Sequence, residues 1–323
     1  MANYVNLKGV NKKINVIGKK ALLEIVKPMK VFDPSSHILI FADPRGGSTW
    51  ITEVISTIPN TSVMWEPLTV EQMPAFERLN FVGSGRRQHI PKHEKWTEAR
   101  TTFEDLFSGS LTNYFLVSRT SLIDYATSSN LIFKFTKGTG ILPWLCENFS
   151  FNFRPLHFIR HPFAVVSSQI HHGAWGYTYN QFSIPDRAYV DIYKRNKHFL
   201  ETLHTKEEEL TAVWCIHNTD SIKSKNKKWI SLTYENTLLK PQQAIEYLFT
   251  EWGLGVPSTA YNLIEKPSRT TKEGSLKSNP MEQISKWKNY FSDEKIKSMK
   301  RVLDYFEVEL YSDNFLPHYA LGV

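Results

Sequence analysis

Residues 37–50 of the chain read His37-Ile38-Leu39-Ile40-Phe41-Ala42-Asp43-Pro44-Arg45-Gly46-Gly47-Ser48-Thr49-Trp50. The first six residues form a short apolar run, which is typical of a buried parallel strand. The two glycines permit a tight turn, and apolar residues recur at helical spacing from Ser48 to Ile55. The sequence therefore predicts a strand, a glycine-rich loop and a helix in direct succession.

Short apolar runs of the same kind predict further strands at 63–65, 131–135, 156–160 and 229–234. Helical patterns lie between or after them, at 141–148, 163–171, 207–221, 241–252, 281–291 and 293–306. Strands that alternate with helices indicate a parallel sheet. The expected fold class is α/β, with a P-loop-like central parallel sheet and helices on both faces.

The 323 residues suit one large domain rather than several independent ones. We expect residues 1–30 to be a helical preface and residues 31–323 to form a single domain. Two segments, about 68–130 and 173–205, interrupt the alternation of strands and helices and are rich in aromatic, histidine and polar residues. Such insertions above a sheet often line substrate pockets, so we expect them to form the pocket for an acceptor molecule.

The formal net charge is +7, which suits a polyanionic ligand, nucleic acid or an anionic surface. No nucleic-acid-binding signature accompanies the basic residues, so no nucleic-acid partner is expected. Cys146 and Cys215 are too few and too far apart for a disulfide framework or a metal site. The sequence shows no signal peptide and no transmembrane run, so we expect a cytoplasmic protein.

The loop Pro44-Arg45-Gly46-Gly47-Ser48-Thr49 has the chemistry of an anion site. Its glycines let backbone N–H groups approach a ligand, and the following helix directs its positive end at the same place. Ser48 and Thr49 add hydroxyl donors, and Arg45 adds a planar charged fork. These groups together predict an anion with several oxygens, although a purely structural turn would also explain the loop alone.

Two common nucleotide loops do not match this segment. A Walker A loop needs a lysine directly before its hydroxyl residue, and a dinucleotide fingerprint needs three glycines at fixed spacing. Residues 44–49 have neither. Phosphoryl transfer from ATP or GTP therefore loses support, and a kinase with a degenerate loop remains as an alternative.

A second segment, Arg160-His161-Pro162-Phe163-Ala164-Val165-Val166-Ser167-Ser168, follows a predicted strand. Pro162 suits the first turn of a new helix. Arg160 leaves the strand, and Ser168 lies about two helical turns further on, so that both can face one phosphate. An arginine ion pair beside a surface serine would also explain this segment if it stood alone.

Together the two segments resemble the sulfotransferase superfamily, whose members bind 3′-phosphoadenosine 5′-phosphosulfate (PAPS) and release PAP. The resemblance runs loosely from about residue 38 to 254 and implies the sulfotransferase fold with no metal. It implies that the first loop holds the 5′-phosphosulfate and that Arg160 and Ser168 hold the 3′-phosphate. The segment Tyr234-Glu235-Asn236 resembles the "YED" segment of the family. The residues implied to bind PAPS are Arg45, Gly46, Gly47, Ser48, Thr49, Trp50, Arg160, Ser168 and Tyr234, with Arg269, and more weakly Thr270 and Lys272, from a basic tail loop.

Two further segments are similar to the carbohydrate branch of that superfamily. Trp65-Glu66-Pro67-Leu68 resembles its "FEPL" segment, and Leu131-Ile132-Phe133-Lys134 resembles its "LVLK" strand. The chain departs from the branch at His161, where Asp is usual, and at Gln169, which often is Arg. The expected acceptor is a hydroxyl of a sugar or glycoconjugate. A small phenol, alcohol or amine is the alternative, as is a PAP-binding protein without catalytic activity.

The reaction that the resemblance implies is an in-line transfer, which depends on positioning and fixed positive charge. Arg45, with the loop, is expected to stabilise the leaving phosphate, and Lys134 is expected to act as a second cation. A hydroxyl acceptor also needs a general base. Glu66 is the first candidate, and His171 and His172 are the alternatives. Together with Trp175, these two histidines are also expected to shape the acceptor-binding loop. The sequence does not indicate an oligomeric state.

Overall fold

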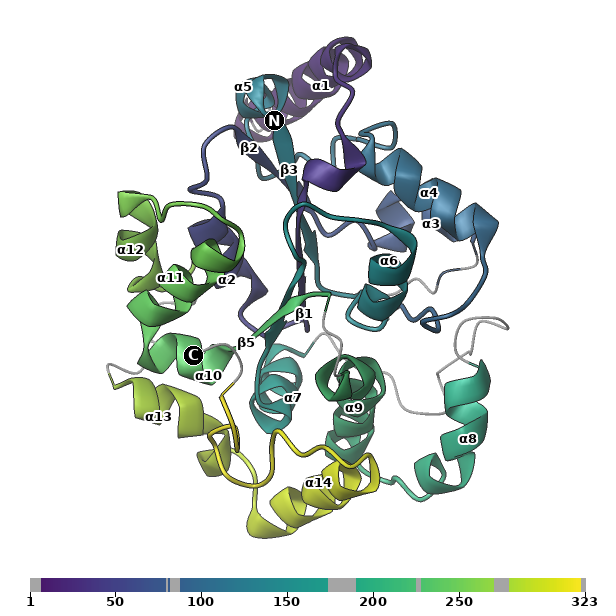
Figure 1. Ribbon diagram of the computed structural model, residues 1–323, viewed down its shortest axis with the longest axis vertical. Coiled ribbons are helices and arrows are strands. Elements are labelled where there is room, and N and C mark those ends of the chain that lie inside the picture. Colours follow the sequence, from purple (N-terminus) through teal and green to yellow (C-terminus); the bar gives the residue numbers. More distant parts are fainter. Residues whose placement is uncertain are drawn as a thin grey trace, which may run out of the picture.

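The computed structural model describes residues 7–79, 81, 88–173, 190–224, 228–269 and 279–320. Five strands form one parallel sheet in the order β2-β3-β1-β4-β5 (Figure 1). They are β1 (Ile38–Ala42), β2 (Thr61–Trp65), β3 (Asn130–Phe135), β4 (Leu156–Ile159) and β5 (Ile230–Thr233). The predicted α/β class with a central parallel sheet is confirmed.

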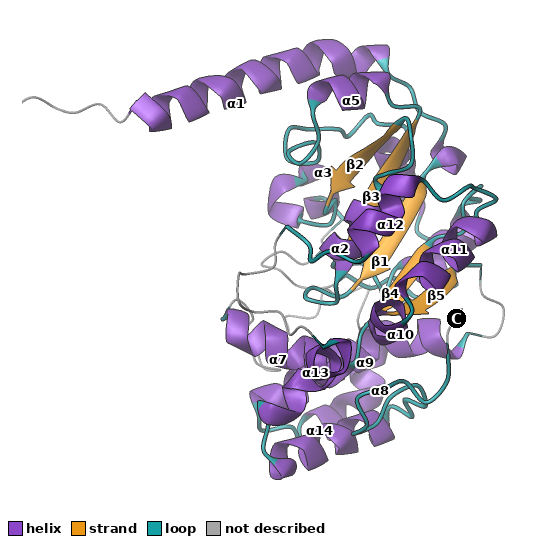
Figure 2. Cartoon of the chain, turned by 90° about the vertical axis from the view of Figure 1, so that its left-hand side faces the viewer, coloured by secondary structure: helices purple, strands orange, loops and turns teal. Residues whose placement is uncertain are grey.

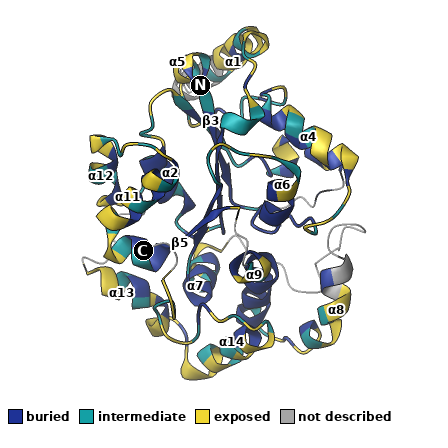
Figure 3. Ribbon diagram, viewed as in Figure 1, coloured by how far each residue is buried: buried dark blue, intermediate teal, exposed yellow. Residues whose placement is uncertain are grey.

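Alternation along β1 assigns its side chains to two cores. Ile38, Ile40 and Ala42 belong to the core beneath α2 (Ser48–Ile55), whereas Leu39 and Phe41 belong to the core on the opposite face. Figure 1 shows the two helical layers on either side of the sheet, and Figure 3 shows the strands as its buried centre. The remaining covering helices are α11 (Pro241–Glu251) and α12 (Ser258–Ile264) on the α2 side, and α4 (Thr97–Phe107) and α6 (Leu142–Asn148) on the other.

A third core lies next to the end of β4, where Ile159 joins it. It is built around Trp214, Trp287 and Tyr311, each at most 1% exposed. Its helices are α7 (Pro162–His172), α8 (Val190–Leu200), α9 (Lys206–Lys223), the 3₁₀ helix η5 (Lys286–Asn289) and α14 (Asp293–Tyr305).

Most of the remaining elements are short and connect these layers. They are α1 (Leu7–Val26), η1 (Lys27–Met29), η2 (Pro34–Ser36), η3 (Val70–Gln72), α3 (Pro74–Glu77), α5 (Leu122–Thr127), α10 (Tyr234–Leu239) and α13 (Pro280–Ser285). The helix expected at 281–291 is divided into α13 and η5. The segment that begins at Tyr234 is the first turn of α10 rather than a strand end, because the Thr233 hydroxyl accepts a hydrogen bond from Asn236 N and caps the helix.

The order of the strands creates a crevice at one edge of the sheet. After β1 the chain crosses to β2, at one end of the sheet, and after β4 it crosses to β5, at the other. The connections from neighbouring strands β1 and β4 therefore diverge, and ligands of open parallel sheets bind at such a point. The loop at 44–47 and the segment that begins at Arg160 lie here.

Candidate active site

The loop after β1 is shaped by unusual backbone angles. Arg45 and Gly47 have φ of 69° and 89°, and Gly46 N donates to Asp43 O at 2.8 Å. Gly47 is the N-cap of α2 and provides no side-chain cap, so the first N–H groups of the helix remain available to a ligand. Gly47, Ser48 and Thr49 line one cavity, which places these donors at its wall.

Gly47 cannot be replaced without conflict. A Cβ at this position would lie 2.7 Å from Cδ2 of Tyr234 and 3.1 Å from Cε1 of Phe158. The positive φ is a second reason for glycine, because side chains of L-residues are strained there. The loop therefore lies directly against Tyr234, one of the residues expected to bind PAPS.

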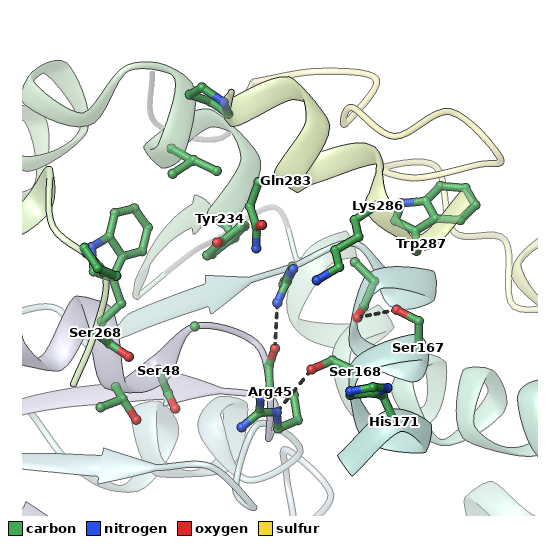
Figure 4. Close-up of a pocket in the computed structure, with 18 of the residues that line it drawn as sticks. Arg45, Ser48, Ser167, Ser168, His171, Tyr234, Ser268, Gln283, Lys286 and Trp287 are labelled. Carbon is green, nitrogen blue, oxygen red and sulfur yellow. Dashed lines mark hydrogen bonds between the residues drawn. The ribbon is translucent and has the colours of Figure 1, made fainter. Parts of the chain in front are cut away.

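Residues from the two βα junctions meet across the crevice (Figure 4). Arg45 Nε donates to Ser168 Oγ at 3.1 Å, and Arg160 Nη1 donates to Arg45 O at 3.0 Å. Burial, and then the charge of Arg160, lower the pKa of Arg45. Across the described ranges neither guanidinium forms an ion pair with a carboxylate, so this positive pair is suited to an anionic ligand.

The cavity at this crevice has a volume of about 690 Å³, which is within the usual range of roughly 300–1,000 Å³ for small-molecule sites. Trp50 and Tyr234 form an edge-on aromatic pair with centroids 5.5 Å apart, and the guanidinium of Arg160 lies 4.3 Å from the centre of the Tyr234 ring. Both aromatic residues line the cavity, as expected for a base-binding wall.

The opposite wall comes from parts of the chain that the sequence analysis did not assign to the site. Lys266, Gln283 and Lys286 line the cavity, as does Trp287 (Figure 4). The two lysines add to the positive charge that Arg45 and Arg160 bring. The predicted helix in the tail was the only sequence signal for this wall, and its spacing gave no indication that it reached the loop.

Lys134 is a buried cation behind the loop. Its side chain is 2% exposed, and Nζ donates to Thr49 Oγ1 at 3.1 Å and to Glu66 Oε1 at 3.2 Å. Nζ also lies 3.5 Å from the ring centroid of Trp65. Burial lowers the pKa of Lys134, and the carboxylate of Glu66 acts in the opposite direction. Lys134 thus connects the anion loop to the candidate base.

Glu66 follows β2 directly and takes a left-handed conformation with φ of 46°. Its N–H donates to the carbonyl of Lys134 at 3.1 Å, because β2 and β3 are neighbours with Trp65 paired to Lys134. The side chain is 25% exposed, which leaves it accessible to solvent. Strained non-glycine residues of this kind often occur at functional sites.

The other predicted residues have different placements. His171 and His172 end α7 and line the cavity. Arg269 is 85% exposed, pairs with Glu53 at 3.0 Å and is not among the residues that line the cavity, although Ser268 is. Its role in binding therefore stays a prediction. Trp175, Thr270 and Lys272 lie outside the described residues.

Both departures from the carbohydrate branch have structural roles here. His161 is the N-cap of α7, where Nδ1 accepts from Phe163 N at 3.1 Å and Nε2 contacts Asn314 O at 2.8 Å. Burial lowers its pKa to about 3, so the ring is neutral. Gln169 is buried, and its Nε2 donates to Pro44 O at 3.0 Å, which holds the loop from behind.

In the described part of the chain, no residue of the insertion at 68–130 lines this cavity. Instead Phe76, Phe103 and Phe107 fill the core on the face of the sheet opposite α2. Its expected role in an acceptor pocket stays a prediction. In the described ranges there is no group of three metal-binding side chains, and no helix there is both long and apolar enough to cross a bilayer.

Scans against protein-family models and against curated proteins give no match. Among solved structures, a sulfotransferase domain from the curacin biosynthetic pathway is similar at 16% identity and a TM-score of 0.45, over 85% of this chain and 99% of that one. A mouse sulfotransferase, SULT7A1, complexed with PAP, has 13% identity and a TM-score of 0.43, over 89% of each chain. The sulfotransferase domain of the Synechococcus PCC 7002 olefin synthase has 13% identity and a TM-score of 0.46, over 87% and 97%. Because each TM-score is below 0.5, the function of this chain has to be inferred from its own residues.

Proposed function

We propose that the chain is a sulfotransferase that takes the sulfuryl group from PAPS and transfers it to a hydroxyl acceptor. The observation that carries the proposal is the meeting of Arg45, Arg160 and Ser168 at one cavity. Two guanidinium groups without a carboxylate partner in the described chain, beside the start of a helix, suit a ligand with several anionic groups. The neighbouring aromatic pair suits a purine.

The residues present fit such a nucleotide in chemistry and in volume. Arg45, Ser48 and Thr49 would hold the 5′-phosphosulfate at the start of α2, and Arg160 with Ser168 would hold the 3′-phosphate. Lys286 would add charge from the opposite wall. When bound, PAPS supplies an activated sulfuryl group, and the positive charge at its phosphate stabilises the departing oxygen.

Glu66 is the proposed general base for the acceptor hydroxyl. It lies next to the loop through the shared contact with Lys134, and its side chain is 25% exposed, although it is not among the residues that line the cavity. Lys134 would hold the carboxylate of Glu66 and the hydroxyl of Thr49 in position. His171 and His172, at the end of α7 on the same cavity, are the alternative bases.

The proposed acceptor is a carbohydrate or glycoconjugate, on the basis of the Glu66 and Lys134 segments, with small phenols, alcohols and amines as the alternative. The test is a screen of these classes with ³⁵S-labelled PAPS, using the wild type and Glu66→Gln. We expect Glu66→Gln to lower turnover by about a hundredfold or more while PAP binding is retained. Glu98→Gln, an exposed change on α4, is the control. Equal turnover of wild type and Glu66→Gln would remove Glu66 as the base.

A further inference from the structure

Exposed apolar side chains are concentrated at the end of the molecule that carries α1 and α5. In the described part of the chain, all large apolar side chains that are more than half exposed lie there: Ile17, Leu22, Ile25, Met29, Val31 and, on α5, Ile123. We call these six residues the α1 surface. Contiguous apolar patches are rare on soluble proteins and usually mark a site of interaction.

The α1 surface is the outward face of a helix whose other face is already packed. Leu23 is 1% exposed and Val26 packs on the same core, which fixes the end of α1 to the body. Ile17, Ala21 and Ile25 are spaced by four and therefore share another side of the helix, where Ile17 and Ile25 are 66% and 63% exposed. Figure 2 shows α1 extending beyond the rest of the molecule, with α5 next to its attached end.

The charge of this region is strongly positive. Seven lysines occur between residues 7 and 30, whereas Glu24 is the one acidic residue there. At helical spacing Lys20 lies on one side of the apolar stripe, whereas Lys19 lies on the opposite face of the helix, and both are exposed.

We propose that the α1 surface binds to an anionic lipid bilayer, with α1 lying in the interface between the bilayer and water. The apolar stripe would enter the boundary of the acyl chains, and Lys20 beside it would reach the headgroups. Self-association through the same face would bring the lysines of two copies together, which is electrostatically unfavourable. The chain passes from α1 to the start of β1, whereas the cavity lies where the strands end. A molecule bound to the bilayer through α1 would therefore keep its cavity open to solvent.

The test is flotation of the full chain with vesicles of phosphatidylcholine alone and with vesicles that contain about one third phosphatidylglycerol. We expect binding to the anionic vesicles only, and weaker binding as salt is added. Ile17→Ser with Ile25→Ser should reduce the partition coefficient about tenfold or more, since it removes apolar burial. Lys20→Gln should reduce it about fivefold, because it removes one positive charge beside the stripe.

Tyr319→Ser changes an exposed apolar residue far from α1 in sequence and is the matched control, expected to bind as the wild type does. The thermal unfolding curve and PAP binding of every variant report folding and the proposed function separately. Absence of binding to anionic vesicles, equal binding to both vesicle types, or binding that survives the double isoleucine change would overturn the proposal. A solution dimer that the isoleucine change dissociates would assign the surface to a second copy instead.

Discussion

Gly47 determines how closely the anion loop can approach the aromatic wall. Its φ of 89° and the 2.7 Å between a built Cβ and Tyr234 are two separate constraints on the same residue. Two other glycines of the chain serve as comparisons for these two constraints. Gly253 has φ of 66° but open space around it, and Gly255 has open space without a positive φ.

Gly47→Ala should therefore destabilise the protein more than the other two changes and should abolish PAP binding. We expect Gly255→Ala to be neutral within about 0.5 kcal/mol. Gly253→Ala should cost about 1–2 kcal/mol from the backbone alone. Denaturant unfolding of the three variants measures these differences. If Gly47→Ala unfolds like Gly255→Ala and binds PAP normally, the loop does not have the conformation described.

His161 makes the free energy of unfolding depend on pH. Its folded pKa of about 3 lies below its ordinary value of 6.5, so below pH 6.5 the unfolded chain binds a proton that the folded protein excludes. The contribution of His161 to the free energy of unfolding is fully present above about pH 6.5 and decreases as the pH is lowered towards 3. At pH 5 the loss is about 2 kcal/mol.

His161→Asn keeps a capping side chain without a titrating ring. The free energy of unfolding of this variant should change less between pH 7 and pH 5 than that of the wild type. Buried Glu235, whose pKa is raised by burial, acts in the opposite direction in both proteins, so the difference between the two is the quantity to measure. Parallel pH profiles would show that His161 is not the neutral cap inferred here.

At the scale of elements, α7 and the loop after β1 behave as one unit. Arg160, which follows β4, and Ser168, within α7, each form one hydrogen bond with Arg45, and Gln169, also within α7, donates one to the carbonyl of Pro44. Gln169 does so from a position that is 1% exposed, so its role is to position the loop and not to bind ligand. The sequence indicated the strand, the loop and the helix but not this bond.

Gln169→Leu should weaken PAP binding about threefold to tenfold, because loss of one buried hydrogen bond costs about 1 kcal/mol and releases the loop. The turnover of bound substrate should change less than the affinity. Gln72→Leu, an exposed change in η3, should leave both unaffected. Titration calorimetry with PAP measures the affinity, and an unchanged Kd in Gln169→Leu would contradict the positioning role.

The sequence predicted those parts of the molecule that depend on local pattern. Each strand was visible as an apolar run because the strands of the parallel sheet are largely buried, and Arg45 and Arg160 were found because each follows a strand end. Ser168 was found from its spacing, about two helical turns after Arg160. The wall formed by Lys266 and Lys286 was not predictable. Those residues lie more than 90 positions from Arg160 along the chain. Packing of α12 on α2 brings Lys266 to the cavity, and packing of η5 on α7 brings Lys286 there.

At the scale of the whole molecule, the two ends of the strands have different proposed roles. The edge where the strands end carries the cavity and its positive charge, and the region around α1, which leads into β1, carries the proposed lipid-facing surface (Figures 1 and 2). Both places carry positive charge, which suits the two proposed ligands, a nucleotide and an anionic bilayer. Each can be tested while the other is left intact.

The most direct test of the proposed function is calorimetric titration of the wild type and Arg160→Ala with PAP and with adenosine 5′-monophosphate, which lacks the 3′-phosphate. The account predicts that the wild type binds PAP at least about tenfold more tightly, since charged hydrogen bonds to that phosphate contribute about 1.5–3 kcal/mol. Arg160→Ala should remove most of this preference and leave the affinity for the monophosphate nearly unchanged. Equal affinity of the wild type for both nucleotides, or the same preference in Arg160→Ala, would contradict the assignment of this cavity to PAPS.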